Sequence, residues 1–189
     1  MNQTASFINR TYSSEGFVIG RKKFGEADRI LVLFTKDFGK ISLIAKGVRK
    51  LTSRKRGGIE IFSYVRFSAI KGRSLDMLSE VQVVDSFEKI RRNLNKVSLG
   101  YYFCEVIGRI TREDEKHSEV FDIVKEALVS LGTQKQLKRL RLEFVRDVIT
   151  CLGFWPKGRR MDNPDAVLES ITERKMNSVR VGKKMLQQN

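Results

Sequence analysis

A short segment in the first half of the chain, residues 46–58, concentrates positive charge. It holds six cationic side chains within eleven residues and no carboxylate: Lys46, Arg49, Lys50, Arg54, Lys55 and Arg56. Cations at this density can follow a phosphate backbone, because each phosphate that they neutralise releases a condensed counterion. A solvated loop without a ligand can have the same composition, so the segment predicts nucleic-acid contact with that loop as the alternative. Four cations earlier in the chain are expected to support the contact: Arg21, Lys22, Lys23 and Arg29.

Aromatic residues beside a cation form a second candidate for nucleic-acid binding. Residues 59–70 are predicted as one long alternating strand, with Phe62, Tyr64 and Arg66 on the same face. Aromatic rings on such a face can stack on bases. Apolar residues lie on both faces of this predicted strand, which favours the alternative that the helical part of the protein covers it.

A third cationic group surrounds a predicted helix in the second half of the chain: Lys135, Lys138, Arg139, Arg141 and Arg146. Glu143 and Asp147 offset part of this charge. A solvated helix face is the ordinary meaning of such a pattern. The binding hypothesis is that the group holds an acidic peptide tail or continues a nucleic-acid path.

The residue types needed for catalysis are scarce. The single histidine, His117, lies in a charged run and is predicted to be a solvated residue at the start of a helix. Cys104 and Cys151 are too far apart for a CxxC zinc pair and are expected to be buried, reduced thiols. No stretch has the glycines and the lysine of a phosphate-binding loop. We therefore expect no enzyme activity, no metal and no cofactor, and we expect Glu26 and Asp28 to orient their turn through hydrogen bonds.

The whole chain is strongly basic. Its 189 residues include 37 Lys and Arg against 22 Asp and Glu, a formal charge of +15. Residues 1–80 contribute 16 − 7 = +9 and residues 81–189 contribute 21 − 15 = +6, so the excess charge is denser in the first part. This excess predicts a polyanionic partner. A membrane partner is not expected, because the apolar runs are too short to span a bilayer and residues 1–10 do not resemble a signal peptide. Together with the reduced thiols expected for Cys104 and Cys151, this predicts a cytoplasmic protein.

The hydrophobic pattern changes near residue 84. Before it, five short apolar or alternating stretches are separated by turn residues and predict a small closed or nearly closed antiparallel barrel: 17–19, 29–35, 41–45, 59–70 and 75–84. After it, apolar residues repeat with helical spacing and predict a short helix that begins near residue 85 and four more: 95–111, 118–131, 134–152 and 164–172. The predicted fold class is α+β with two domains, a barrel over residues 1–84 and an all-α domain over residues 85–189.

Several strings of residues resemble the RecO family of bacterial recombination mediators. The most specific string is Phe24-Gly25-Glu26-Ala27-Asp28-Arg29-Ile30-Leu31, and the likeness continues at residues 33–35, 39–41, 45–50, 75–76, 84–87, 101–102 and 152–154. The resemblance implies an N-terminal OB-fold barrel, a helical C-terminal domain and a nucleoid-associated role in recombinational DNA repair. Many members carry a four-cysteine zinc module after the segment equivalent to Gly153-Phe154 and are longer, whereas residues 155–163 here contain no metal ligands of that kind.

The resemblance also implies a set of partners. Members of the family are non-enzymatic proteins that bind single- and double-stranded DNA and anneal complementary strands. They act with RecR to load a RecA-type recombinase onto DNA coated with single-strand-binding protein, whose acidic C-terminal tail would suit the cationic helix. Two alternatives remain open from the residues alone: an RNA-binding OB-fold protein of the translation apparatus, and a protein-interaction scaffold that does not bind DNA.

Overall fold

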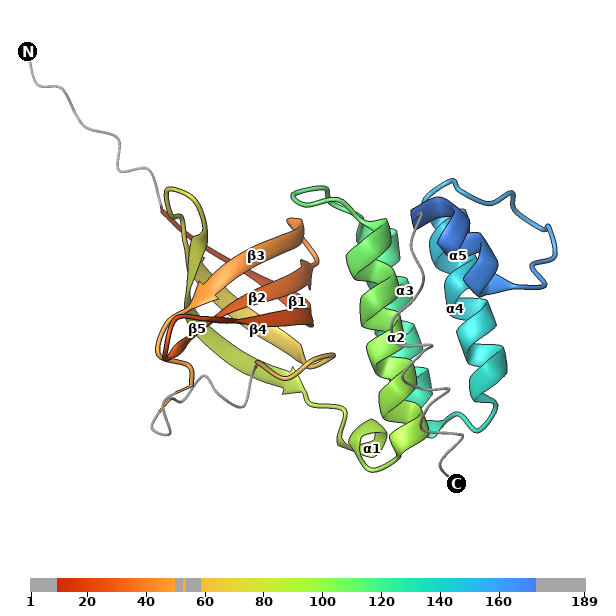
Figure 1. The fold of residues 1–189 in the computed structure, drawn as a ribbon, viewed down its shortest axis with the longest axis horizontal. Helices are drawn as coiled ribbons and strands as arrows, with labels where there is room; N and C mark the ends of the chain where they lie inside the picture. The colour runs from red at the N-terminus through yellow and green to blue at the C-terminus, as the bar shows by residue number, and fades with distance from the viewer. Residues whose placement is uncertain (1–9, 50–52, 54–58, 173–189) are drawn as a thin grey trace, which may run out of the picture.

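The first part of the chain is a closed five-stranded barrel. The computed structural model describes residues 10–49, 53 and 59–172. The strands are β1 (Thr11–Phe24), β2 (Asp28–Thr35), β3 (Gly39–Ala45), β4 (Tyr64–Ile70) and β5 (Asp76–Asp85), and they close in the order β1-β2-β3-β5-β4 (Figure 1). Every neighbouring pair is antiparallel except β3 and β5. This topology is an OB-fold, and it confirms the predicted fold class.

Alternation along β2 and β3 fills the barrel. Leu31 and Leu43 lie opposite each other, as do Leu33 and Ile41, and all four side chains are buried. The residues between them point outward, because successive side chains of a strand face opposite sides. A register shift between Val18 and Gly20 lets the long strand β1 pair with β4 along its first half and with β2 along its second half.

The second part of the chain is a bundle of helices packed on one side of the barrel (Figure 1). The helices are α1 (Glu88–Arg91), α2 (Leu94–Ile110), α3 (Ser118–Thr133), α4 (Leu137–Cys151) and α5 (Pro164–Thr172). The Asn93 side chain accepts a hydrogen bond from the Lys96 N–H and caps α2, and Asn163 caps α5 through the Ala166 N–H. None of the described helices is long and apolar enough to cross a membrane.

Aromatic rings join the barrel to the helices. The Phe17 ring of β1 stacks on Tyr64 of β4 at 4.8 Å and meets Phe121 of α3 at 5.1 Å. Gly100 of α2 lets the helix approach Phe62, because a Cβ at this position would lie 3.1 Å from the Phe62 ring. The two parts therefore share one continuous hydrophobic core.

The loop between α2 and α3 fastens the start of β3. Lys40 donates hydrogen bonds from its ammonium group to the carbonyl oxygens of Gly108 (2.8 Å) and Thr111, which lie at the C-terminal end of α2. Burial lowers the pKa of Lys40. Gly39 has a φ of 67°, and a Cβ at this position would lie 1.9 Å from the Glu115 carbonyl oxygen, so the close contact of turn and loop requires glycine.

The strand expected over residues 17–19 is the much longer β1, Thr11–Phe24, and two further predicted elements differ from the structure. The strand expected over residues 59–70 begins only at Tyr64, because residues 59–63 form a buried turn in which Phe62 has a φ of 57°. The short helix expected to begin near residue 85 begins only at Glu88: Phe87 takes a left-handed conformation, and the Asp85 carboxylate accepts from the Phe87 N–H at 2.7 Å. In both places apolar side chains enter the core through turns, which a periodic pattern does not reveal.

Candidate nucleic-acid interface

The start of the basic segment is fixed against the turn between β1 and β2. The Asp28 carboxylate accepts a hydrogen bond from the Gly47 N–H at 2.7 Å, and the Ala27 carbonyl accepts from the Arg49 N–H at 2.9 Å. The Arg49 guanidinium also donates to the Glu26 carbonyl oxygen at 2.7 Å. Asp28 therefore orients a turn through hydrogen bonds as expected, but the turn belongs to the end of β3, and Glu26 contributes its backbone and not its carboxylate.

Five cations gather around these two joined turns, and we call this group the basic end: Lys22, Lys23, Arg29, Lys46 and Arg49. Lys23 of β1 lies directly opposite Arg29 of β2 in the strand register. Like charges that face each other across strands destabilise a sheet, and a bound anion relieves that repulsion. Lys22, Lys23, Lys46 and Arg49 are exposed, and no ion pair to any of the five is found within the described part of the chain.

The other end of the basic segment is held by two further arginines. Arg21 forms an ion pair with Glu60 at 2.5 Å. Arg91 of α1 donates hydrogen bonds to the Ile61 carbonyl and the Ser63 hydroxyl, both at 3.0 Å, and its guanidinium lies 4.2 Å from the centre of the Phe62 ring. Residues 59–63 are thus fastened to the helical part, and Arg21 is already paired with a carboxylate.

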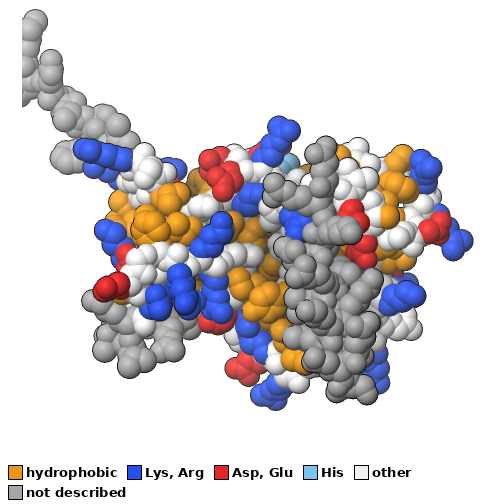
Figure 2. Space-filling model, viewed as in Figure 1, with side chains coloured by type: hydrophobic (Ala, Val, Ile, Leu, Met, Phe, Trp, Pro, Cys, Tyr) orange, Lys and Arg blue, Asp and Glu red, His pale blue; other side chains and the backbone are white. Residues whose placement is uncertain are grey.

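Four of the predicted contact residues, Lys50, Arg54, Lys55 and Arg56, lie outside the described residues. The segment that contains them is bounded by two fixed turns, one at residues 46–49 and one at residues 59–63. Both turns lie on the barrel, and the β1–β2 turn is on the side remote from the helices (Figure 1). Figure 2 shows Lys and Arg side chains gathered over the barrel. OB-folds bind oligonucleotides through the β2–β3 face and the loops beside it, and the basic end borders that face.

The aromatic stacking surface proposed for residues 62–66 is wrong. Phe62 is fully buried and Tyr64 is 6% exposed, beneath α2 and α3 respectively. The Tyr64 hydroxyl donates to the Glu15 carboxylate, and burial together with this bond raises the pKa of Tyr64 to about 12. The alternative, a face covered by the helical part, is the one that the structure shows. The exposed ring near the basic end is Phe24, at 44% exposure, which the sequence pattern did not single out.

Comparison with known families decides the relationship of this chain. Residues 9–87 match the model of the recombination protein O N terminal region, and residues 91–160 match that of the C terminal region. The chain belongs to the RecO family. The DNA repair protein RecO of Symbiobacterium thermophilum is 32% identical over 146 residues, which cover 77% of this chain and 58% of that protein.

Other RecO proteins show the same partial coverage. The protein from Roseiflexus sp. (strain RS-1) is 29% identical over 166 residues, 88% of this chain and 58% of the relative. The protein from Alkaliphilus metalliredigens is 36% identical over 115 residues, 61% of this chain and 47% of the relative. This RecO-family chain therefore spans less than two thirds of the length of these relatives.

The cationic helix of this RecO-family chain has mostly paired charges. Arg141 of α4 forms an ion pair with Asp165 of α5 and lies over the Tyr102 ring at 4.6 Å. Arg139 pairs with Glu143 at 2.7 Å and Arg146 with Asp147 at 2.9 Å. Lys135 and Lys138 are exposed, and no ion pair to either is found among the described residues. Of this group, only Lys135 and Lys138 are therefore exposed cations without an ion pair among the described residues.

The scarce reactive residues are dispersed. His117 immediately precedes α3, and its imidazole lies 3.7 Å from the Glu115 carboxylate. Cys104 is buried, and burial raises the pKa of its thiol to about 12, so it stays protonated at neutral pH. Cys151 is half-buried beside Glu119, so only Cys104 is buried as expected. Across the described ranges, no three His, Cys, Asp or Glu side chains are grouped so that they could hold a metal ion.

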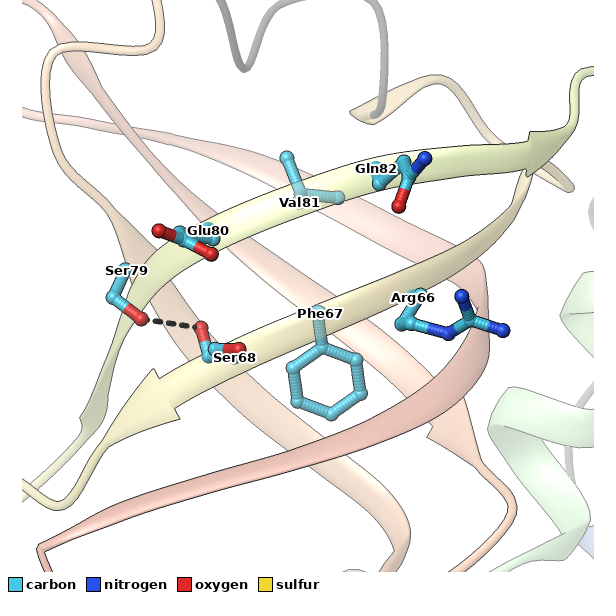
Figure 3. Close-up of a pocket in the computed structure, with 7 residues that line it drawn as sticks. All are labelled: Arg66, Phe67, Ser68, Ser79, Glu80, Val81 and Gln82. Carbon is cyan, nitrogen blue, oxygen red and sulfur yellow. Dashed lines mark hydrogen bonds between the residues drawn. The ribbon is translucent and has the colours of Figure 1, made fainter.

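A shallow groove runs between β4 and β5 on the outside of the RecO-family barrel (Figure 3). Residues 66–68 of β4 and 79–82 of β5 line it. The Ser79 hydroxyl donates to the Ser68 carbonyl at 2.9 Å, and Arg66 pairs with Glu15 at 2.7 Å. Because its one cationic side chain already has a carboxylate partner, the groove adds no free charge to the basic end.

Proposed function

We propose that this chain is a DNA-binding protein of recombinational repair and that the basic end contacts DNA phosphates. The observation that carries the proposal is the set of five cations without ion-pair partners in the described structure, which lie on and beside two hydrogen-bonded turns at the end of the OB-fold barrel remote from the helices. Membership of the RecO family supports it, since the relatives are named DNA repair proteins. Lys50, Arg54, Lys55 and Arg56 extend the same contact, with Arg21 in a supporting role through Glu60.

The proposed activity is that of a non-enzymatic mediator. The chain binds single- and double-stranded DNA, anneals complementary strands and acts with RecR to help load a RecA-type recombinase onto DNA coated with single-strand-binding protein. Cations that neutralise phosphates reduce the repulsion between two strands, so the basic end supplies what annealing needs physically. The proposal requires no catalytic group, because no covalent bond of the DNA is made or broken.

The proposed division of labour follows the two parts of the chain. DNA contact is assigned to the barrel part, residues 1–84, and partner docking to the helical part, residues 85–189. Lys135 and Lys138 are the exposed cations that would hold the acidic C-terminal tail of single-strand-binding protein. Arg139 and Arg146 reach the same tail by exchanging their present carboxylate partners, whereas Arg141 is committed to Asp165.

Binding of fluorescent oligonucleotides to the full chain tests the DNA assignment. The Arg54/Lys55/Arg56→Ala variant is expected to lower the slope of log affinity against log salt by about 0.7 for each single-strand phosphate contact removed. The control is Lys89/Arg92/Arg160→Ala, which removes the same charge from exposed sites on the helical part. An unchanged slope in the first variant would contradict the loop assignment.

Two further measurements separate the proposal from its alternatives. Acceleration of annealing between complementary strands precoated with single-strand-binding protein supports the mediator function, whereas binding without annealing reduces it to DNA binding. Preference for structured RNA over single-stranded DNA would favour the translation-apparatus alternative. No DNA affinity at moderate salt would favour the interaction scaffold.

A further inference from the structure

We propose that Phe24 is a base-stacking residue that makes the basic end prefer unpaired over paired DNA. The inference rests on the proposed DNA-binding function and adds a determinant of strand specificity to it. Phe24 is the last residue of β1, and its side chain is 44% exposed. The apolar ring is partly exposed to water beside cations, so its position suits a ligand that is both anionic and flat.

The strand register places the Phe24 ring on the outer face of the barrel. Arg21 lies opposite Leu31, whose side chain is buried inside the barrel. Because side chains alternate along a strand, Lys22 and Phe24 point to the other side, away from the barrel interior. Phe24 therefore stands on the outside, beside the turn that Asp28 and Gly47 hold together.

Apolar side chains continue this outer face onto the neighbouring strands. Lys22 pairs with Ile30 of β2, and Ile30 pairs with Ile44 of β3. Ile30 and Ile44 are half-buried, and Lys46 follows the end of β3 as an exposed cation. Figure 2 shows hydrophobic and basic side chains together over the barrel. The face thus combines an exposed ring, a strip of aliphatic surface and cations at its border, on the strands that OB-folds use for oligonucleotides.

The chemistry of this face separates single strands from duplexes. Lysine and arginine side chains attract the phosphates of both forms, because both carry the same backbone charge. An aromatic ring can stack only on a base whose face is free, and the base faces of a duplex are covered by their neighbours. The charges of the basic end therefore supply affinity for either form, and Phe24 supplies an additional contact that only unpaired bases can make.

Substitution of Phe24 tests the inference in the full chain, with labelled oligo(dT) and a labelled hairpin duplex as probes. Phe24→Ala is expected to weaken oligo(dT) binding by about 5-fold to 150-fold, the range of a single stacking contact, and to leave duplex binding within about twofold. The salt slope is expected to stay unchanged, because no phosphate contact is removed. Phe24→Leu is expected to resemble Phe24→Ala, and Phe24→Trp is expected to retain oligo(dT) affinity.

Matched variants keep the test decisive. Phe154, at 51% exposure after α4, is the control ring, and Phe154→Ala is expected to bind both probes as the unsubstituted chain does. The chain has one tryptophan, Trp155. In a Trp155→Phe background, all tryptophan fluorescence therefore comes from the indole that Phe24→Trp introduces. Its fluorescence is expected to fall when oligo(dT) binds and not when the duplex binds.

The possible failures are distinguishable. If the unsubstituted chain binds neither probe at low salt, the proposed function itself is overturned. If it binds both probes but Phe24→Ala binds oligo(dT) equally well, or loses affinity for the two probes equally, only the stacking assignment is overturned. Unchanged DNA binding together with loss of binding to a partner protein would assign the exposed ring to a protein interface instead.

Discussion

The basic end of the barrel and the cationic group at α4 (Lys135 before the helix and four residues on it) each contain five cations, yet their charges are paired differently. At the basic end, Lys23 and Arg29 face each other across two strands, and the carboxylate of Asp28 is occupied by a backbone N–H. On α4, three of the five cations have a carboxylate partner on the same helix or on α5. Equal numbers of charges thus give one surface without ion pairs among the described residues and one that is largely neutralised internally.

This difference predicts that substitutions in the two regions affect different properties, DNA binding in one and stability in the other. Substitution of unpaired cations is expected to change DNA binding and leave stability nearly unchanged. Substitution of paired cations is expected to change stability and leave DNA binding nearly unchanged. Four variants test the contrast.

The largest effect is expected from removal of charge at the basic end. Lys22/Lys23/Lys46→Ala is expected to weaken oligo(dT) binding roughly 100-fold at about 0.1 M salt, since removal of one phosphate contact weakens binding about 5-fold there. Exposed lysines without partners add little to folding, so the free energy of unfolding is expected to change by less than about 0.5 kcal/mol. Fluorescence anisotropy and urea denaturation measure the two quantities, and a decrease in stability larger than the decrease in binding free energy would contradict the contrast.

The second effect is expected at the paired site between α4 and α5. Asp165 accepts from both Arg141 and the Tyr102 hydroxyl, and Arg141→Ala deprives this partly buried carboxylate of a charge-assisted hydrogen bond. The free energy of unfolding is expected to fall by about 1–2 kcal/mol, and Tm by about 2–8 °C. Affinity for oligo(dT) is expected to stay within about twofold of the unsubstituted chain. A decrease in DNA affinity without a decrease in stability would place Arg141 with the basic end.

Asp28→Ala is expected to have a smaller effect on DNA affinity. It tests whether affinity depends on the position of the turn that carries Lys46 and Arg49 or only on the net charge of the basic end. Removal of the carboxylate makes the basic end more positive, which on charge alone would tighten DNA binding. It also leaves the Gly47 N–H without its acceptor and frees the turn that carries Lys46 and Arg49. We expect affinity for oligo(dT) to fall a few-fold and the free energy of unfolding to fall by about 1 kcal/mol.

Two variants serve as controls for Asp28→Ala. Asp28→Asn keeps an acceptor oxygen without the charge and is expected to bind DNA at least as well as the unsubstituted chain. Asp162→Ala removes an exposed carboxylate from the helical part and is expected to change neither property. Tighter binding by Asp28→Ala would show that charge, and not the position of the turn, governs affinity.

The smallest effect is expected from Glu15, a paired acid of the barrel. Hydrogen bonds from Tyr64 and Arg66 lower the pKa of Glu15 below its ordinary value of 4.5. A carboxylate with a lowered pKa in the folded state stabilises the fold above the unfolded pKa, and this contribution disappears as pH falls through the folded pKa. As pH falls below about 4.5, the unsubstituted chain is therefore expected to lose stability that Glu15→Gln does not lose. Equal acid dependence of the two chains, measured by urea denaturation, would contradict the assignment.

Local patterns of apolar, turn and capping residues were sufficient to predict the order of strands and helices. Short apolar stretches bounded by turn residues predicted β2 and β3, at residues 29–35 and 41–45. Asn163 followed by Pro164 predicted the start of α5, because a side-chain acceptor and a fixed φ both favour a first helical turn. These features depend on residues that are neighbours along the chain.

The parts that the sequence did not reveal depend on contacts across the fold. Residues 59–63 are apolar on both faces, and only their packing beneath α2 and the bonds from Arg91 make them a turn instead of a strand. The bond from Gly47 to Asp28 joins residues 19 positions apart, which meet only when β2 and β3 pair. The exposure of Phe24 is equally invisible in a motif that reads as ordinary strand and turn.

The salt dependence of oligo(dT) binding tests the central claim most directly. If the basic end contacts phosphates, Lys22/Lys23/Lys46→Ala lowers the slope of log affinity against log salt by about 2, three contacts at about 0.7 each. The control Lys89/Arg92/Arg160→Ala, which removes the same net charge from the helical part, keeps the slope of the unsubstituted chain. Equal slopes in all three proteins, or an equal decrease in both variants, would contradict the assignment of DNA binding to the basic end.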